Sequence, residues 1–378
     1  MALDREQRFI SQSNLFLKAA LAESCASRLE DLPMVSERAA VALDPVVISD
    51  YQRISDAERV ALRRDYEGDF GVAYFVVRNP DTQPQAAHPL FDMVEQLKHD
   101  LPLAHPLPHP LEGHPEARAR FGGPDGTVKI YDLPIAPGAN RYREQAETSE
   151  LFALHHDGLG SGGTVETVFL YTDSPPLAGG YTFFQNVTRL SLDLARLDPG
   201  AFRQLFLPDA ITIVRPRGKG AIRVTTPVLF VNERNEAQSF FRVASGEYSV
   251  TWRAGSDALD RARHFLSKHS EPFSYGSTFL HFNEAGHGCL IRNRSVAHGR
   301  TGFIDAADLG RRRCLSRKWY MRFERDATYK HVPGMFVSEA FRALYPELFG
   351  EDLLQGEWQY NSLADRNERA HSTAPLPK

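Results

Sequence analysis

Two histidines and an aspartate form the pattern in this sequence that is best suited to chemistry. His155 and Asp157 are separated by one residue at the end of the strand-like run Phe152–His155. Because side chains on a strand alternate between its two faces, these two can point the same way. His298, brought in by a further strand, would add a second imidazole. The three side chains would then bind a metal ion from one side.

The chemistry of such a centre follows from the coordination positions that it leaves open. Two histidines and one carboxylate on one face of an octahedral ion are the arrangement of non-haem Fe(II) oxygenases. Two of the three remaining positions suit the C1 carboxylate and keto oxygen of 2-oxoglutarate, and the third suits O2. The pattern therefore predicts a centre that uses Fe(II), 2-oxoglutarate and O2.

A fixed cation is also needed for the far carboxylate of 2-oxoglutarate. Arginine meets this need because its planar guanidinium bonds a carboxylate through two N–H groups. Arg313 and Arg317 follow His298 by 15 and 19 residues, on the next strand-like run. They are four residues apart, so they can share one face of a strand. Both are candidates for binding an anionic cosubstrate.

Three segments resemble the taurine dioxygenase/clavaminate synthase branch of the Fe(II)/2-oxoglutarate-dependent oxygenases. They are the His-x-Asp of residues 155–157, the Gly-Gly-Tyr-Thr of residues 179–182 and the Asn-Arg-x-x-x-His-Gly-Arg of residues 293–300. The resemblance covers about Thr127 to Arg325. It implies a mainly β fold with flanking helices, a distorted jelly roll also called the double-stranded β-helix.

The resemblance also implies roles for single residues. The proposed Fe(II) ligands are His155, Asp157 and His298. Thr182 would contact 2-oxoglutarate, and Arg313 would bind its distal carboxylate. Arg317 would lie near the bound carboxylates of cosubstrate or substrate.

The expected activity is hydroxylation of an unactivated C–H bond in a small polar molecule, with release of succinate and CO2. An amino acid or amino-acid derivative is the favoured substrate, because Arg317 offers a carboxylate anchor and the His-Gly-Arg motif resembles the amino-acid-oxidising branch. Substrate choice is predicted to come from the segments Ile135–Glu150, Gly158–Gly163 and Arg242–Tyr248. Within the last of these, Glu247 is the candidate contact for a cationic group.

Three alternatives remain open from the residues alone. A shift of one residue would make His156 the ligand and place Gly158 where the carboxylate should be, as in Fe(II)/2-oxoglutarate halogenases. A desaturase or cyclase would use the same centre on a similar substrate. A non-catalytic binding protein of the cupin type would share the jelly roll with an inert or absent metal.

Hydrophobic periodicity indicates the elements that position these residues. Helical spacing marks Glu6–Glu23, Asp56–Tyr66 after Ser55, Phe91–His99, Leu190–Leu207, Ser256–Lys268 and Ser338–Leu348. Short β-rich runs begin at Thr127 and include Thr127–Tyr131, Phe152–His155, Glu166–Thr172, Tyr181–Phe184, Ile211–Val214, Ile222–Val231, Ser239–Val243, Cys289–Asn293 and Leu315–Phe323. This predicts a helical N-terminal lobe with a Pro/His-rich connector (1–124), a jelly-roll core (125–325) and a C-terminal extension (326–378).

Composition narrows the classes of partner. The 378 residues carry 44 Lys+Arg against 48 Asp+Glu, a net charge of −4, and no cluster of cations that would bind nucleic acid. Apolar runs are far shorter than the roughly 18 residues of a membrane helix. The charged N-terminus and the three scattered cysteines favour a cytoplasmic protein without a disulfide framework. We expect a small-molecule substrate; the oligomeric state is left open.

Overall fold

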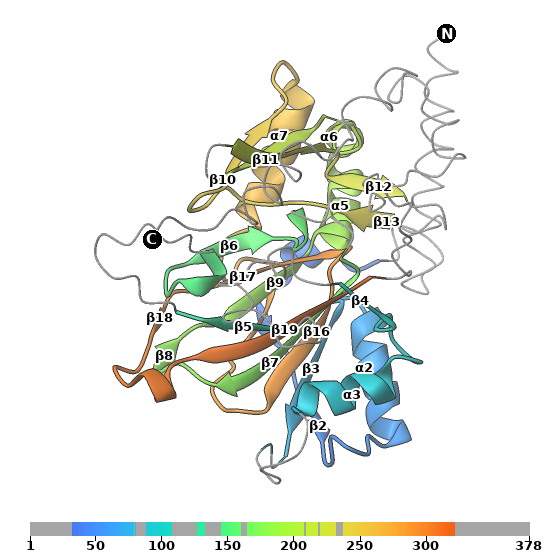
Figure 1. The fold of residues 1–378 in the computed structure, drawn as a ribbon. Coiled ribbons are helices and arrows are strands. Elements are labelled where there is room, and N and C mark those ends of the chain that lie inside the picture. Colours follow the sequence, from blue (N-terminus) through green and yellow to red (C-terminus); the bar gives the residue numbers. More distant parts are fainter. Residues whose placement is uncertain are drawn as a thin grey trace.

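Two facing β-sheets make up the centre of the molecule (Figure 1). The computed structural model describes residues 32–78, 80, 88–107, 127–132, 145–159, 165–207, 209–217, 220–231 and 237–321 of the chain. The large sheet contains, in spatial order, β2 (Val46–Ile48), β3 (Val72–Val77), β16 (His287–Arg292), β7 (Thr167–Ser174), β19 (Cys314–Met321) and β4 (His105–Leu107), with β5 (Val128–Tyr131) also paired to β19. The small sheet contains β1 (Val41–Ala42), β15 (Thr278–Leu280), β9 (Thr182–Asn186), β17 (Val296–Arg300) and β6 (Phe152–His155).

Apolar side chains from both sheets fill the space between them. Val168 and Leu315 of the large sheet pack in one cluster with Phe184 and Val296 of the small sheet. Burial of this apolar area is the main force that holds the sheets together. The predicted jelly roll, mainly β with flanking helices, is confirmed.

The outer face of the large sheet is covered by two helices, α2 (Asp56–Glu67) and α3 (Pro89–Leu97) (Figure 1). Strand β3 is therefore buried on both sides, with Tyr74 in the inter-sheet cluster and Phe75 beneath the helices. Ser55 caps α2 and forms a capping box with Glu58, so the predicted start of this helix is confirmed.

A further group of elements lies at the end of the sandwich where β6 and β17 are found (Figure 1). It consists of α5 (Val187–Leu197), α6 (Pro199–Gln204), α7 (Asp257–Lys268), β10 (Ile211–Arg217), β11 (Gly220–Thr226), β12 (Leu229–Val231), β13 (Ala237–Ser239) and β14 (Ser249–Trp252). Two short strands, β8 (Ala178–Gly179) and β18 (Phe303–Ile304), pair separately. Single 3-10 turns are η2 (Val35–Glu37), η3 (Gln145–Glu147) and η5 (Leu309–Arg311).

Several predicted elements differ from the structure. The single helix Leu190–Leu207 is wrong, because Pro199 has no N–H to continue α5 and instead begins α6. The run Ile222–Val231 divides around Pro227 into β11 and β12. The strand expected over Ser239–Val243 ends at Ser239.

The residues before 124 form strands as well as helices, since β2, β3 and β4 join the large sheet. The division at residue 124 stays a prediction. The expected helices Glu6–Glu23 and Ser338–Leu348 lie outside the described residues. Within the described ranges, no helix has the length and hydropathy needed to cross a membrane.

The close approach of three strands of the small sheet depends on Gly299. β17 lies between β9 and β6 and pairs His298 directly with His155. A Cβ atom at Gly299 would lie 2.4 Å from Cζ of Phe183 and 2.8 Å from the carbonyl oxygen of Phe152. Any side chain here would push β6 away from β17. The glycine of the His-Gly-Arg motif therefore brings the two histidines together.

Candidate metal centre

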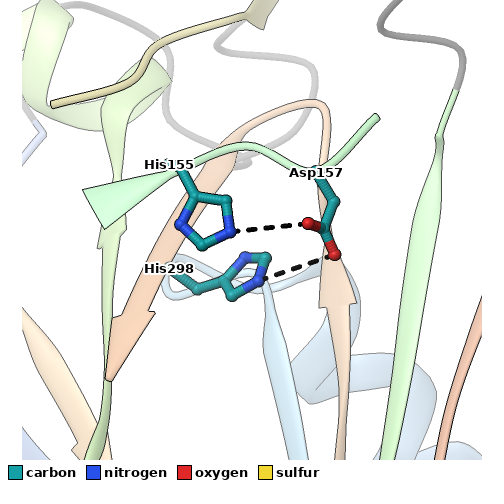
Figure 2. A group of neighbouring side chains, drawn as sticks. All are labelled: His155, Asp157 and His298. Atoms are coloured by element: carbon teal, nitrogen blue, oxygen red, sulfur yellow. Dashed lines mark ion pairs between the residues drawn. The ribbon is translucent and has the colours of Figure 1, made fainter. Parts of the chain in front are cut away.

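The predicted triad converges in the structure (Figure 2). His155 ends β6, Asp157 follows it by two residues, and His298 is in the middle of β17. One ligand atom from each residue lies within 4.8 Å of the others. Nε2 of His155 is 3.4 Å from Oδ1 of Asp157, and Nε2 of His298 is 3.7 Å from Oδ2. All three residues are buried.

Two buried nitrogen atoms of this cluster, Nε2 of His155 and Nδ1 of His298, lack a hydrogen-bond partner within the described part of the chain. Nε2 of His155 is buried without such a partner, whereas Nδ1 of the same ring is 2.9 Å from the carbonyl oxygen of Ala153. A carbonyl can only accept, so it holds the proton on Nδ1 and leaves the Nε2 lone pair facing the cluster. This is the arrangement that a metal-binding histidine requires. The donor set therefore fits Fe(II).

The protonation states also suit metal binding. Burial, assisted by the positive charge of Arg242, lowers the pKa of His155 to about 4. Burial and the neighbouring His155 lower the pKa of His298 to about 3. Burial alone would raise the pKa of Asp157, but Arg317 and the two histidines hold it well below its ordinary value. At neutral pH the centre presents two neutral imidazoles and one carboxylate, which are the forms that coordinate a metal.

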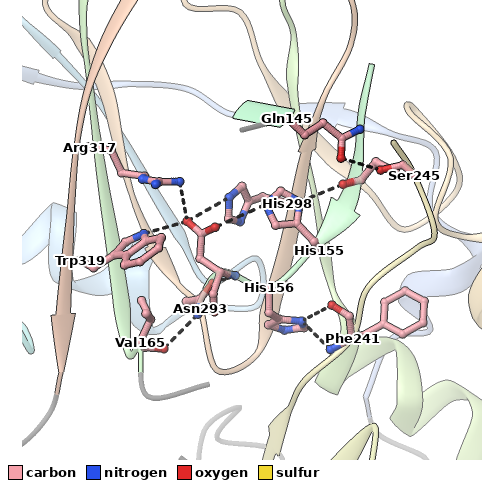
Figure 3. A network of polar contacts seen from close by, with 12 residues as sticks. Gln145, His155, His156, Val165, Phe241, Ser245, Asn293, His298, Arg317 and Trp319 are labelled. Atoms are coloured by element: carbon pink, nitrogen blue, oxygen red, sulfur yellow. Dashed lines mark hydrogen bonds and ion pairs between the residues drawn. The ribbon is translucent and has the colours of Figure 1, made fainter. Parts of the chain in front are cut away.

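His156 points away from the triad and has a structural environment (Figure 3). Its Nδ1 lies 2.9 Å from the backbone nitrogen of Phe241, which donates to it, and its Nε2 lies 3.2 Å from Oγ of Ser239. The ring is fully buried. The halogenase alternative would need this imidazole at the centre, so the geometry favours the register of His155 and Asp157.

Asn293 fixes the backbone of Asp157. Its Oδ1 accepts from the Asp157 amide at 2.9 Å, while its Nδ2 donates to the carbonyl oxygens of Asp157 at 3.1 Å and Val165 at 3.0 Å. Asn293 is the first residue of the Asn-Arg-x-x-x-His-Gly-Arg motif, from which no role for it was predicted. Its role is to hold the segment after β6, where Asp157 has no strand partner among the described residues.

We expect Asn293→Ala to lower the free energy of unfolding by about 2–3 kcal/mol, because buried backbone groups would lose their partners. Denaturant unfolding of the metal-free protein measures this. Asn293→Asp places a buried carboxylate oxygen against the carbonyl oxygens of Asp157 and Val165, so its loss should be at least as large as that of the alanine variant. Equal stability of Asn293→Ala and the parent protein would show that the hydrogen bonds of Asn293 do not stabilise the fold.

The residues expected to bind 2-oxoglutarate come from both sheets. Thr182 is the first residue of β9 and pairs with Arg300 of β17. Arg313 precedes β19, and its Nε lies 3.8 Å from the position of a Cβ at Gly180, two residues before Thr182. Gly179 and Gly180 both have positive φ, of 75° and 71°, which explains the glycine pair of the turn.

Arg313 is a buried cation with an N–H donor that has no hydrogen-bond partner among the described residues. Burial lowers its pKa to about 10, so it stays charged at neutral pH. Its Nη1 has no hydrogen-bond partner among the described residues, and its Cζ lies 5.0 Å from the centroid of the Phe303 ring. A buried guanidinium with a free N–H suits a dicarboxylate ligand.

Arg317 and Trp319, which are labelled in Figure 3, both contact Asp157. Nη1 of Arg317 lies 3.4 Å from Oδ2 of the aspartate, and Nε1 of Trp319 donates to the same oxygen at 2.8 Å. Arg317 was expected near bound carboxylates of cosubstrate or substrate, and its described contact is with a carboxylate of the protein. Trp319 was not predicted.

The segments expected to select the substrate are described only in part. Residues 133–144 and 160–164 lie outside the described ranges. Glu247, the candidate for a cationic substrate group, is 2.8 Å from Nη2 of Arg215. Arg300 donates to the carbonyl oxygens of Thr148 and Glu150 at 2.6 Å each, which ties the segment before β6 to the small sheet.

Comparison with known families decides the classification. The profile of the family described as "Taurine catabolism dioxygenase TauD, TfdA family" matches residues 37–319. The chain belongs to the TauD/TfdA family. This TauD/TfdA member is 33% identical over 163 residues to a uridine-5'-phosphate dioxygenase from Streptomyces sp. The match covers 42% of this chain and 58% of that relative, a little over half its length.

The solved structures that match this chain include two oxygenases with bound iron. The oxygenase OrfP, in complex with Fe and alpha-ketoglutaric acid, has a TM-score of 0.50 and 16% identity and covers 88% of this TauD/TfdA member and 98% of its own chain. Asparagine oxygenase, in complex with Fe(II), hydroxyasparagine and succinate, has a TM-score of 0.47 and 17% identity over 70% of this chain and 78% of its own. At such identity the likeness to OrfP shows the fold.

Proposed function

We propose that this TauD/TfdA member is an Fe(II)/2-oxoglutarate-dependent dioxygenase that hydroxylates an unactivated C–H bond of a small polar substrate and releases succinate and CO2. The observation that carries the proposal is the convergence of His155, Asp157 and His298 within 4.8 Å, with a lone pair of His155 that has no hydrogen-bond donor among the described residues. The ligand assignments are part of this proposal.

Each of the proposed site residues has a defined task in this scheme. When bound, Fe(II) supplies O2 activation coupled to decarboxylation of 2-oxoglutarate. His155, Asp157 and His298 hold the metal from one side and leave the other side to ligands. Arg313 binds the distal carboxylate of 2-oxoglutarate, and Thr182 adds a hydroxyl hydrogen bond. Binding of both ends of the cosubstrate fixes its orientation before O2 arrives.

Two classes of substrate have support. The resemblance in sequence favours an amino acid or an amino-acid derivative, whose carboxylate would meet Arg317. The Streptomyces relative, by its name, acts on uridine 5'-phosphate, and a nucleoside 5'-phosphate is therefore the second class. Both classes are small and polar and carry an anionic group, a carboxylate or a phosphate, so the cations near the centre suit either.

A substrate screen tests the proposal. The purified protein, loaded anaerobically with Fe(II), is given 2-oxoglutarate, O2 and either amino acids and their conjugates or nucleoside 5'-phosphates. We expect succinate formation to rise with one class and the product mass to increase by one oxygen. A product with two fewer hydrogens would indicate the desaturase or cyclase alternative. No succinate with any candidate, and none without substrate, would favour the cupin-like alternative.

Chloride should not change the product. Asp157 supplies a carboxylate at the position that halogenases leave open, and a carboxylate is a stronger ligand for Fe(II) than chloride. We therefore expect the oxygenated product even at high chloride concentration. Mass spectrometry of the product, with and without chloride, measures this. A chlorinated product would overturn the assignment of Asp157.

The cytoplasmic location and the absence of a nucleic-acid partner stay predictions from the sequence. They are compatible with a small-molecule oxygenase.

A further inference from the structure

The carboxylate of Asp157 is held by two donors from the opposite sheet (Figure 3). Trp319 and Arg317 are two residues apart on β19, so their side chains point to the same face. Both donate to Oδ2 of Asp157, the indole Nε1 at 2.8 Å and the guanidinium Nη1 at 3.4 Å. Cζ of Arg317 lies 4.4 Å from the centroid of the Trp319 ring, so each side chain also orients the other.

The two oxygens of Asp157 are therefore not equivalent. Both oxygens face a histidine of the triad, Oδ1 at 3.4 Å from Nε2 of His155 and Oδ2 at 3.7 Å from Nε2 of His298, but only Oδ2 also receives the indole and guanidinium N–H groups. Asn293 bonds the N–H and the C=O of Asp157. With the backbone and one oxygen both fixed, the side chain cannot rotate to exchange its oxygens without breaking the indole bond.

We propose that Trp319 is a positioning residue that makes Asp157 a one-oxygen ligand, through Oδ1, to the metal of the proposed function. A carboxylate that binds through both oxygens would occupy two coordination positions and leave two where 2-oxoglutarate and O2 need three. Hydrogen bonds from outside the metal's own ligands set ligand orientation in this way. We call the bond from Trp319 to Oδ2 of Asp157 the clamp. The inference rests on the proposed function for the identity of the metal, but not for the geometry of the clamp.

Arg317 is less suited to this task than Trp319. Its contact with Oδ2 is longer, and its buried Nε has no hydrogen-bond partner within the described ranges. That N–H is available to the carboxylate of a bound ligand. The neutral indole, with a single donor already used on Asp157, is not drawn away by such a ligand. The clamp on Asp157 therefore persists when Arg317 turns toward cosubstrate or substrate.

The first test is Trp319→Phe, which keeps an aromatic ring and removes the N–H. We expect its affinity for Co(II), titrated anaerobically into metal-free protein, to fall by about 10–100-fold. The visible absorption spectrum of bound Co(II) should also change, because its coordination number changes. Trp252→Phe is the matched control, because it makes the same change at a different place. Trp252 is on β14, and its ring packs against that of Phe241 at a centroid distance of 6.2 Å. Unchanged affinity and spectrum in Trp319→Phe would refute the clamp.

A second measurement needs no variant at the site. The chain has three tryptophans, each with one indole N–H that gives its own signal in an ¹H–¹⁵N NMR spectrum. Titration with Zn(II) should shift one of them strongly, because its acceptor becomes a metal ligand. That signal should remain in Trp252→Phe. If none of the indole signals moves when Zn(II) binds, Trp319 does not position the ligand, even where Trp319→Phe fails to fold.

The outcomes separate this inference from the proposed function. If Co(II) affinity depends on Trp319 but the parent protein forms no succinate, the clamp is supported and the proposed oxygenase function is refuted. If the parent protein forms succinate and Trp319→Phe has the same Co(II) affinity and spectrum as the parent, the oxygenase function is supported and the clamp is refuted.

Discussion

His155→Ala is expected to reduce Fe(II) affinity and 2-oxoglutarate turnover by more than about a hundredfold, because loss of a direct ligand exceeds the effect of losing an outer partner. Burial of the imidazole and its pKa of about 4 keep Nε2 unprotonated at neutral pH. Fe(II) content after anaerobic loading and succinate formation measure the two effects.

His156→Ala is the matched control, because it removes the adjacent imidazole. This residue bonds the Phe241 peptide and Ser239, so its loss should lower the free energy of unfolding by about 1–3 kcal/mol. Metal binding should survive at temperatures where the variant remains folded. The opposite result, with activity retained in His155→Ala and lost in His156→Ala, would establish the shifted register.

Arg313→Ala is expected to raise the 2-oxoglutarate concentration needed for half-maximal turnover by tens of fold. A hydrogen bond to a charged group contributes about 1.5–3 kcal/mol, which corresponds to this range. The substrate requirement should change much less, since Arg313 lies beside Gly180, in the turn that leads to Thr182. Steady-state kinetics with each component varied separately makes the comparison.

Two variants support that comparison. Arg313→Lys keeps the charge but loses the planar fork, so its 2-oxoglutarate requirement should fall between those of the parent and the alanine variant. Arg317→Met should act on Asp157 as well, because Arg317 contacts that carboxylate. If Arg313→Ala leaves the 2-oxoglutarate requirement unchanged and Arg317→Met carries the whole effect, the cosubstrate is bound by Arg317.

The triad could be predicted from the sequence because two of its members lie in one short motif. The spacing of His155 and Asp157 on a strand end is local information, and His298 stands in a second recognisable motif. Trp319 could not be predicted in the same way. Its bond to Asp157 joins residues that are 162 positions apart and depends on how the two sheets face each other.

The strand β3 was missed for a different reason. Val72–Val77 is a short apolar run without alternation, and such a run does not distinguish a buried strand from a piece of buried helix. Only its pairing with β2 and β16 and the helices over its outer face explain why all its positions are apolar. By contrast, β6 was predicted with its observed limits, because its motif and its turn are local.

The pairing of β3 also constrains how the chain reaches this fold during synthesis. Ala73 pairs with Leu290, so β3 leaves the ribosome more than two hundred residues before its partner β16. Contacts between such distant segments form slowly, and until β16 is made the edge of β3 that faces it is open to association with other chains. Growth temperature and chaperone supply should therefore govern the yield of folded protein more strongly than the stability of the finished molecule does.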